Sequence, residues 1–138
     1  MSKQKITIRA HVSANIDAVW RAWNTPEDIR HWNSASDDWY CPQAENDLRP
    51  EGTFKYRMAA RDGSAAFDFE GIYDRVQPMS EIAYTLGDGR QVVNTFTAVP
   101  TGVEVVTVFE AEGENTLAMQ QEGWQSILNH FKQYVEGN

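Results

Sequence analysis

The feature that most constrains the fold is one long amphipathic helix at the end of a chain that otherwise alternates like strands. No proline occurs between Asn115, expected as the helix cap, and Gly137, expected just beyond the helix end. A helix of about twenty residues is roughly 30 Å long, and its apolar stripe must be buried against another layer. The stripe consists of Leu117, Trp124, Leu128, Phe131 and Val135.

The segments before this helix alternate between apolar and polar side chains, which is typical of half-buried strands. The first such segment spans residues 5–12. Two short helices are expected next, the second beginning at Thr25-Pro26. Alternation resumes over residues 39–110, where turn sequences separate about six further strands. The first of these contains Pro42, which favours an edge strand or a bulge.

This order of elements predicts an α+β fold. A curved antiparallel sheet of about seven strands is expected to wrap around the C-terminal helix, with two short helices after the first strand. Because the sequence has no internal repeat, low-complexity tract or linker, residues 1–138 are predicted to form a single domain. The single cysteine, Cys41, excludes an internal disulfide and is consistent with a reducing compartment.

The charge balance disfavours several classes of partner. The chain carries 20 acidic and 12 basic residues, a net charge of −8, and it has no basic cluster. Nucleic acids and anionic membrane surfaces are recognised mainly through Lys and Arg, so neither is expected as a partner. No apolar run resembles a signal peptide or a membrane span, which predicts a cytoplasmic location.

Few residues suggest catalysis or metal binding. His11, His31 and His130 have no cysteine or carboxylate neighbours at ligand spacing, so no metal site is expected. Cys41 could meet His31 in space, but nothing in the sequence requires it. There is also no glycine-rich phosphate loop. No catalytic residue and no cofactor are therefore predicted.

The unusual feature of the composition is its high content of aromatic residues: five Trp, five Tyr and six Phe. They predict either a rich core or a core with a ring-lined cavity. Four polar residues fall among the apolar positions: Gln121, Asn94, Tyr56 and Tyr84. The polar group of each is either hydrogen-bonded within the protein, placed at a hydrated mouth of the cavity or facing a ligand. Gly123, in the middle of the last helix, is interpreted as a site of close approach by a neighbouring element rather than a hinge.

Local motifs along most of the chain give it a family resemblance. The motifs are residues 13–20 with their Val-Trp pair, Thr25-Pro26-Glu27 followed by Trp32, residues 47–54, Gly71-Ile72-Tyr73 with Gln77-Pro78, and Gly123-Trp124 with Leu128 and Tyr134. In this order the chain resembles the activator of heat shock protein 90 ATPase homologue family. One departure is Glu51, which stands where the family pattern usually has the first of two glycines.

The resemblance implies a helix-grip fold of the START-like (SRPBCC) superfamily, like that of the birch-pollen allergen. Members of this superfamily carry hydrophobic ligands between sheet and long helix, and some relatives are cyclases or hydroxylase components. The namesake co-chaperone has this fold only as its C-terminal domain, and its ATPase stimulation depends heavily on a separate N-terminal domain for which this chain has no room.

The leading prediction is therefore non-enzymatic binding of a hydrophobic or aromatic small molecule by a monomer or homodimer. The alternatives are a chaperone-associated or stress-related interaction module and a cyclase-like enzyme acting on a bulky ring substrate. The candidate ligand-binding residues are Trp32, Trp39, Phe54, Tyr56, Phe67, Phe69, Tyr84, Asn94, Phe96, Gln121, Trp124 and Leu128.

Overall fold

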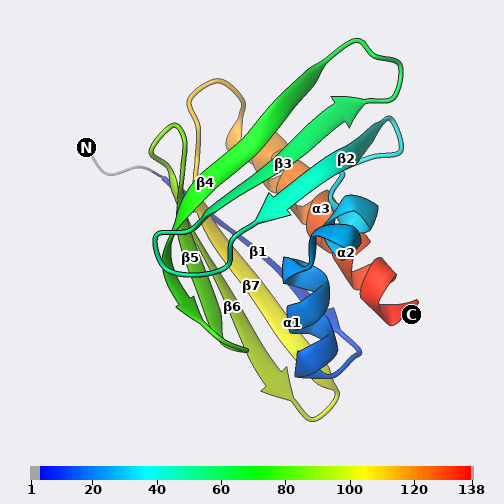
Figure 1. Cartoon of the computed structure of the whole chain (residues 1–138), viewed down its shortest axis with the longest axis vertical. Coiled ribbons are helices and arrows are strands. Elements are labelled where there is room, and N and C mark those ends of the chain that lie inside the picture. Colours follow the sequence, from blue (N-terminus) through cyan, green and yellow to red (C-terminus); the bar gives the residue numbers. More distant parts are fainter. Residues whose placement is uncertain (1–3, 138) are drawn as a thin grey trace.

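The computed structural model describes residues 4–137, which form one sheet and three helices. The chain begins with β1 and two short helices, continues through six consecutive strands and ends in one long helix (Figure 1). The elements are β1 (Lys5–Val12), α1 (Ile16–Asn24), α2 (Pro26–Trp32), β2 (Trp39–Asn46), β3 (Thr53–Ala60), β4 (Ala66–Gln77), β5 (Glu81–Leu86), β6 (Gln91–Val99), β7 (Gly102–Glu110) and α3 (Leu117–Glu136).

The sheet is antiparallel throughout and has the order β1-β7-β6-β5-β4-β3-β2. Strands β2 to β7 follow one another as a meander, and β1 joins the far edge by pairing with β7. The sheet curls, and α3 lies across its concave face (Figure 1). The predicted α+β helix-grip fold is thus confirmed. β2 is indeed an edge strand, and its register with β3 shifts between Tyr40 and Gln43, on either side of Pro42.

The beginning of α3 differs from the prediction by one residue. Thr116 is the cap, and its hydroxyl accepts a hydrogen bond from the Met119 backbone at 3.1 Å. Asn115 instead donates its backbone N–H to the Glu112 carboxylate at 2.6 Å. At the other end, Gly137 follows the helix with an ordinary right-handed φ of −83° rather than in a left-handed C-terminal motif. At the start of the helix, Asn and Thr are both preferred cap residues, so the sequence alone did not distinguish Asn115 from Thr116.

Glu51, the departure from the family pattern, lies in the turn between β2 and β3 with a φ of 69°. This is the left-handed region that favours glycine. Its backbone N–H donates to the Tyr73 carbonyl at 2.8 Å, and the Tyr73 N–H donates to the Gly52 carbonyl at 2.9 Å. These two bonds tie the turn to β4, which explains why the strained conformation persists with a glutamate.

Aromatic side chains fill the core around the C-terminal half of α3. Phe131 is completely buried, and its ring lies 4.9 Å from those of Trp23 in α1 and Trp32 in α2, measured between centroids. Both contacts are edge-to-face, which suits aromatic quadrupoles. The two short helices therefore fill this end of the space between sheet and helix.

Candidate ligand-binding site

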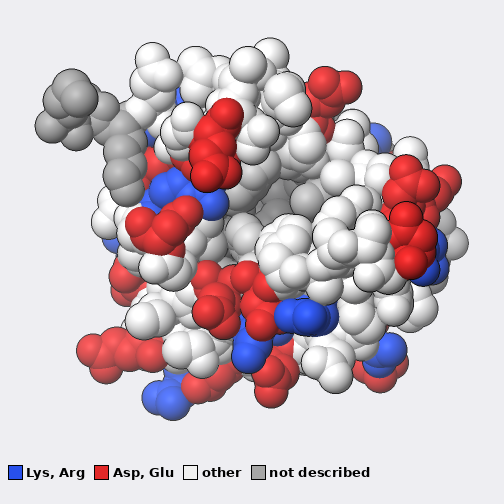
Figure 2. All heavy atoms as spheres, turned by 90° about the horizontal axis from the view of Figure 1, so that it is seen from above, with Lys and Arg blue, Asp and Glu red and all other residues white. Residues whose placement is uncertain are grey.

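A cavity of about 360 Å³ remains between the sheet and the N-terminal part of α3. The end of the molecule seen in Figure 2 is hollowed, and the atoms around the hollow are mainly uncharged. The apolar and aromatic wall consists of Ile8, Trp23, Trp32, Phe54, Tyr56, Met58, Phe67, Phe69, Tyr73, Ile82, Tyr84, Met119, Gly123, Trp124, Ile127 and Leu128. The polar wall consists of Asn33, Arg90, Asn94, Thr107, Glu112, Asn115 and Gln120.

The sheet side of the wall is organised around Phe54. Its ring centroid lies 5.1 Å from that of Tyr56, 5.2 Å from Tyr73 and 4.7 Å from Tyr84. Phe54 pairs in register with Gly71 on β4. A Cβ atom on Gly71 would lie 2.9 Å from the Phe54 ring and 2.7 Å from a backbone oxygen. The glycine therefore makes room for the ring at the centre of the wall.

The helix side of the wall is set by Trp124. Its indole stacks on the ring of Phe109 in β7, with centroids 3.8 Å apart and planes 8° from parallel. The Phe69 ring meets it edge-on at 5.9 Å. Because these rings brace one another from three elements, this part of the wall is held in place by the protein's own side chains.

Two buried polar groups are satisfied within the protein. The Asn94 side chain donates to the Ile82 carbonyl at 3.2 Å and accepts a hydrogen bond from the Thr107 hydroxyl at 2.7 Å. Gln120 donates to the carbonyls of Glu112 and Asn115 and accepts from the Glu112 N–H at 2.8 Å. These bonds bind β5 to β7 and fix the loop before α3, so both residues stabilise the site's frame.

Three tyrosines line the cavity, and their hydroxyl groups stay protonated at neutral pH. Burial raises the pKa of Tyr73 to about 12, and its hydroxyl donates to the Asn46 side chain. Burial is also the main cause that raises the pKa of Tyr56 and of Tyr84 well above the ordinary value. For Tyr84 the nearby Asn94 amide and Arg90 guanidinium act weakly in the opposite direction. These phenols can orient a bound molecule by hydrogen bonding, but they are not bases.

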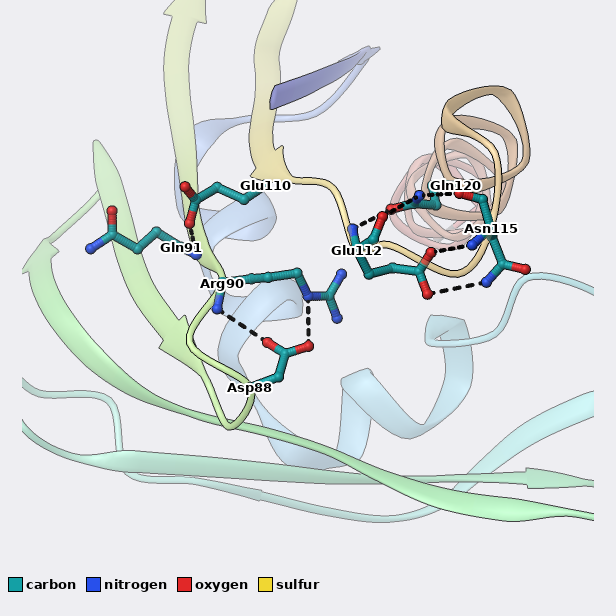
Figure 3. A network of polar contacts seen from close by, with 7 residues as sticks. All are labelled: Asp88, Arg90, Gln91, Glu110, Glu112, Asn115 and Gln120. Carbon is teal, nitrogen blue, oxygen red and sulfur yellow. Dashed lines mark hydrogen bonds and ion pairs between the residues drawn. The ribbon is translucent and has the colours of Figure 1, made fainter. Parts of the chain in front are cut away.

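The mouth of the cavity carries two separate polar clusters (Figure 3). Arg90 lies on the turn between β5 and β6, and its Nε donates to the Asp88 carboxylate at 2.8 Å. Its side chain is only 18% exposed and reaches toward the loop that carries Glu112 and Asn115 (Figure 3). The Glu112 carboxylate accepts both the backbone and the side-chain N–H of Asn115. The Arg90 side chain is thus held by Asp88 at the cavity wall.

The structure brings most of the predicted site residues together around one cavity. These are Trp32, Phe54, Tyr56, Phe67, Phe69, Tyr84, Asn94, Trp124 and Leu128. It does not bring Trp39 or Phe96 there. Trp39 packs on the half-exposed Phe67 from the edge strand. Phe96 packs on Trp20 and Trp23, at the filled end of the sheet. Both residues share a face with cavity residues, but they lie too far along their strands.

Gln121 was predicted to face the cavity, and this is wrong. It is exposed, and its amide donates to the Thr7 carbonyl at 3.4 Å. The predicted arc was anchored on Leu117, which is itself 44% exposed. The inward stripe instead passes through Gln120, Trp124, Leu128, Phe131 and Val135. Gln120 therefore takes the buried place assigned to Gln121.

The interpretation of Gly123 as a close-approach site is also wrong. A Cβ atom built there meets no heavy atom within 4 Å outside its own local backbone. The position opens into the cavity. The sequence did not identify Gly123 or Arg90 as cavity-wall residues. A glycine in a helix gives no sign of which way it faces, and an arginine after a turn is normally solvated.

Other chemistry is sparse in the part of the chain that is described. No group of three or more His, Cys, Asp or Glu side chains among residues 4–137 could hold a metal ion. Burial raises the pKa of the Cys41 thiol to about 11, so it is protonated at neutral pH. No helix within residues 4–137 has the length and apolar content needed to cross a membrane.

Comparison with known proteins gives the chain relatives with the same architecture. An AHSA1-like protein from Aeromonas hydrophila shares 46% identity over 97% of this chain and 93% of its own, with a TM-score of 0.92. A protein from Cytophaga hutchinsonii shares 46% identity over 99% of this chain and 93% of its own, with a TM-score of 0.81. A protein from Chromobacterium violaceum, 23% identical over 98% of this chain and 99% of its own, has the same fold with a TM-score of 0.87.

No curated protein matches the chain. The family model described as "Activator of Hsp90 ATPase homolog 1-like protein" matches residues 13–136, nearly the whole sequence. The chain therefore belongs to the family of activator of Hsp90 ATPase homolog 1-like proteins.

Proposed function

We propose that this chain, acting as a single binding domain, holds a small apolar or aromatic molecule between its sheet and α3. One observation supports this above the others: the ring-lined space of about 360 Å³ is left unfilled by the protein's own side chains. Protein interiors are normally close-packed, so a ring-lined space that the protein's own side chains do not fill favours a ligand. The volume lies at the small end of the range for ligand sites, which favours a compact ligand.

The character of the wall supports binding rather than chemistry. Rings dominate it, and the buried amides of Asn94 and Gln120 are already hydrogen-bonded inside the protein. A ligand would therefore gain its affinity mainly from apolar contact. The alternatives, a chaperone-associated module and a cyclase-like enzyme, remain predictions of the family resemblance. The cytoplasmic location, which was expected from the sequence, and the monomeric or dimeric state also remain predictions.

Native mass spectrometry of the purified chain tests the proposal. We expect a molecule retained from the cell, or one added 2-naphthol per chain at saturation, because the cavity accommodates one compact ring system. Any retained molecule identifies the natural ligand class by its mass. A spectrum with neither a retained molecule nor a saturable 2-naphthol adduct would contradict the proposal.

Arg90 should contribute to selectivity at the mouth. Its guanidinium lines the cavity and can donate to a ligand oxygen, and a hydrogen bond to a charged group stabilises a complex by about 1.5 kcal/mol or more. We expect wild-type protein to prefer 2-naphthol over naphthalene, and Arg90→Gln to reduce that preference about tenfold. Calorimetric titration measures both affinities. Arg75→Gln is the matched control, because Arg75 pairs with Glu81 away from the cavity. Equal preferences in Arg90→Gln and wild type would exclude this role.

A further inference from the structure

Gly123 breaks a rule of helix construction without a packing reason. It lies in the interior of α3, where glycine is less stable than alanine. It is not among the residues with a positive φ, so its backbone conformation suits any amino acid. A side chain would find no atom within 4 Å of its Cβ. Neither conformation nor close packing therefore explains the glycine.

The direction in which the position faces supplies an explanation. Gly123 lines the cavity, as do Met119 and Gln120 one turn before it and Ile127 one turn after it. Residues three and four apart lie side by side on a helix. The missing side chain is thus a gap in the helix side of the cavity wall. Any residue larger than glycine would project into the binding space itself.

We infer that Gly123 is a size-determining residue, which lets a flat fused-ring ligand pack directly against the backbone of α3. The inference rests on the proposed function and adds the shape of the ligand. The sheet side of the wall is built of rings around Phe54, on which a flat ring system can stack. Local rules that fail without a structural reason are expected at functional sites.

The rival explanation is a hinge, in which glycine allows α3 to bend during ligand entry. The two explanations differ in what one methyl group does. A hinge would be impaired by Gly123→Ala whatever the size of the ligand. If Gly123 determines ligand size, binding affinity should fall as the side chain at this position becomes larger, and only large ligands should lose affinity.

The test compares 2-naphthol with 1-pyrenemethanol, which are two-ring and four-ring alcohols, by quenching of tryptophan fluorescence. Trp23, Trp32 and Trp124 line the cavity and report binding. Gly123→Leu should weaken 1-pyrenemethanol at least tenfold and 2-naphthol by less than about threefold, because overpacking penalises the larger ring system. Glu122→Leu, which adds the same side chain at an exposed neighbouring position, should change neither.

Thermal unfolding provides the second readout and guards against misfolding. Gly123→Ala should raise Tm by about 3–5 °C through helix propensity alone, and 2-naphthol binding should be unchanged. Unchanged 1-pyrenemethanol binding in Gly123→Leu, or loss of both ligands in Gly123→Ala, would overturn the inference while leaving the proposed function in place. Failure of wild-type protein to bind either alcohol would instead contradict the proposed function, and the inference with it.

Discussion

Phe131→Ala should lower the free energy of unfolding by about 3–5 kcal/mol, the range typical of a phenylalanine removed from a close-packed core. The Phe131 side chain is completely buried, and its ring contacts Trp23 and Trp32 edge-to-face. Three elements, α1, α2 and α3, meet at this ring. The space left by alanine cannot close without moving all three, so the loss should lie near the upper end of the range.

Chemical denaturation of wild type and variant measures this loss. Phe67→Ala is the matched control, because Phe67 is 51% exposed and should change stability by less than about 1 kcal/mol. If both variants lose a similar amount of free energy of unfolding, the packing around Phe131 does not make the large contribution to stability expected here.

Gly71→Ala should strongly destabilise the sheet although it adds only one methyl group. A Cβ atom there would lie 2.7 Å from the Thr85 carbonyl oxygen and 2.9 Å from the Phe54 ring. The oxygen belongs to the backbone of a paired strand and cannot move cheaply, so overpacking should lower the free energy of unfolding by about 2–3 kcal/mol. Displacement of Phe54 should also narrow the cavity and weaken 2-naphthol binding.

The same substitution at Gly123 should have the opposite sign, since that Cβ meets open space. Denaturation of Gly71→Ala and Gly123→Ala under identical conditions compares the two directly. Destabilisation by both, or by neither, would contradict the placement of Gly71 against a wall residue and of Gly123 against a cavity. Comparison of the two variants thus distinguishes a glycine that is required for close packing, Gly71, from a glycine that leaves space in the cavity, Gly123.

The architecture could be predicted from the sequence because its signals are periodic. Alternation over residues 5–12 and 39–110 and the long helical stripe each repeat several times, so an error at one residue does not change the type of element. The predicted start of α3 was off by one residue because Asn115 and Thr116 are both preferred cap residues. The exposed Leu117 then led to the choice of Gln121 in place of Gln120.

The cavity itself could not be predicted, because rings that line a space and rings that fill it have the same pattern. Phe96 and Phe54 both face inward, yet Phe96 packs on Trp20 and Trp23 while Phe54 borders the cavity. The difference depends on where α1 and α2 lie along α3, which is a tertiary property. Gly123 and Arg90 escaped prediction for a related reason: their importance comes from the space beside them.

Methyl-selective NMR during a 2-naphthol titration shows whether the cavity between the sheet and α3 is the ligand site. The reporters on the cavity wall are Ile8, Met58, Met119, Ile127 and Leu128, and the controls on the outer surface are Ile72 and Met79. If the ligand binds in the cavity, we expect saturable chemical-shift changes at the wall methyl groups and none at the controls. An absence of saturable shifts, or shifts centred on Ile72 or Met79, would contradict it.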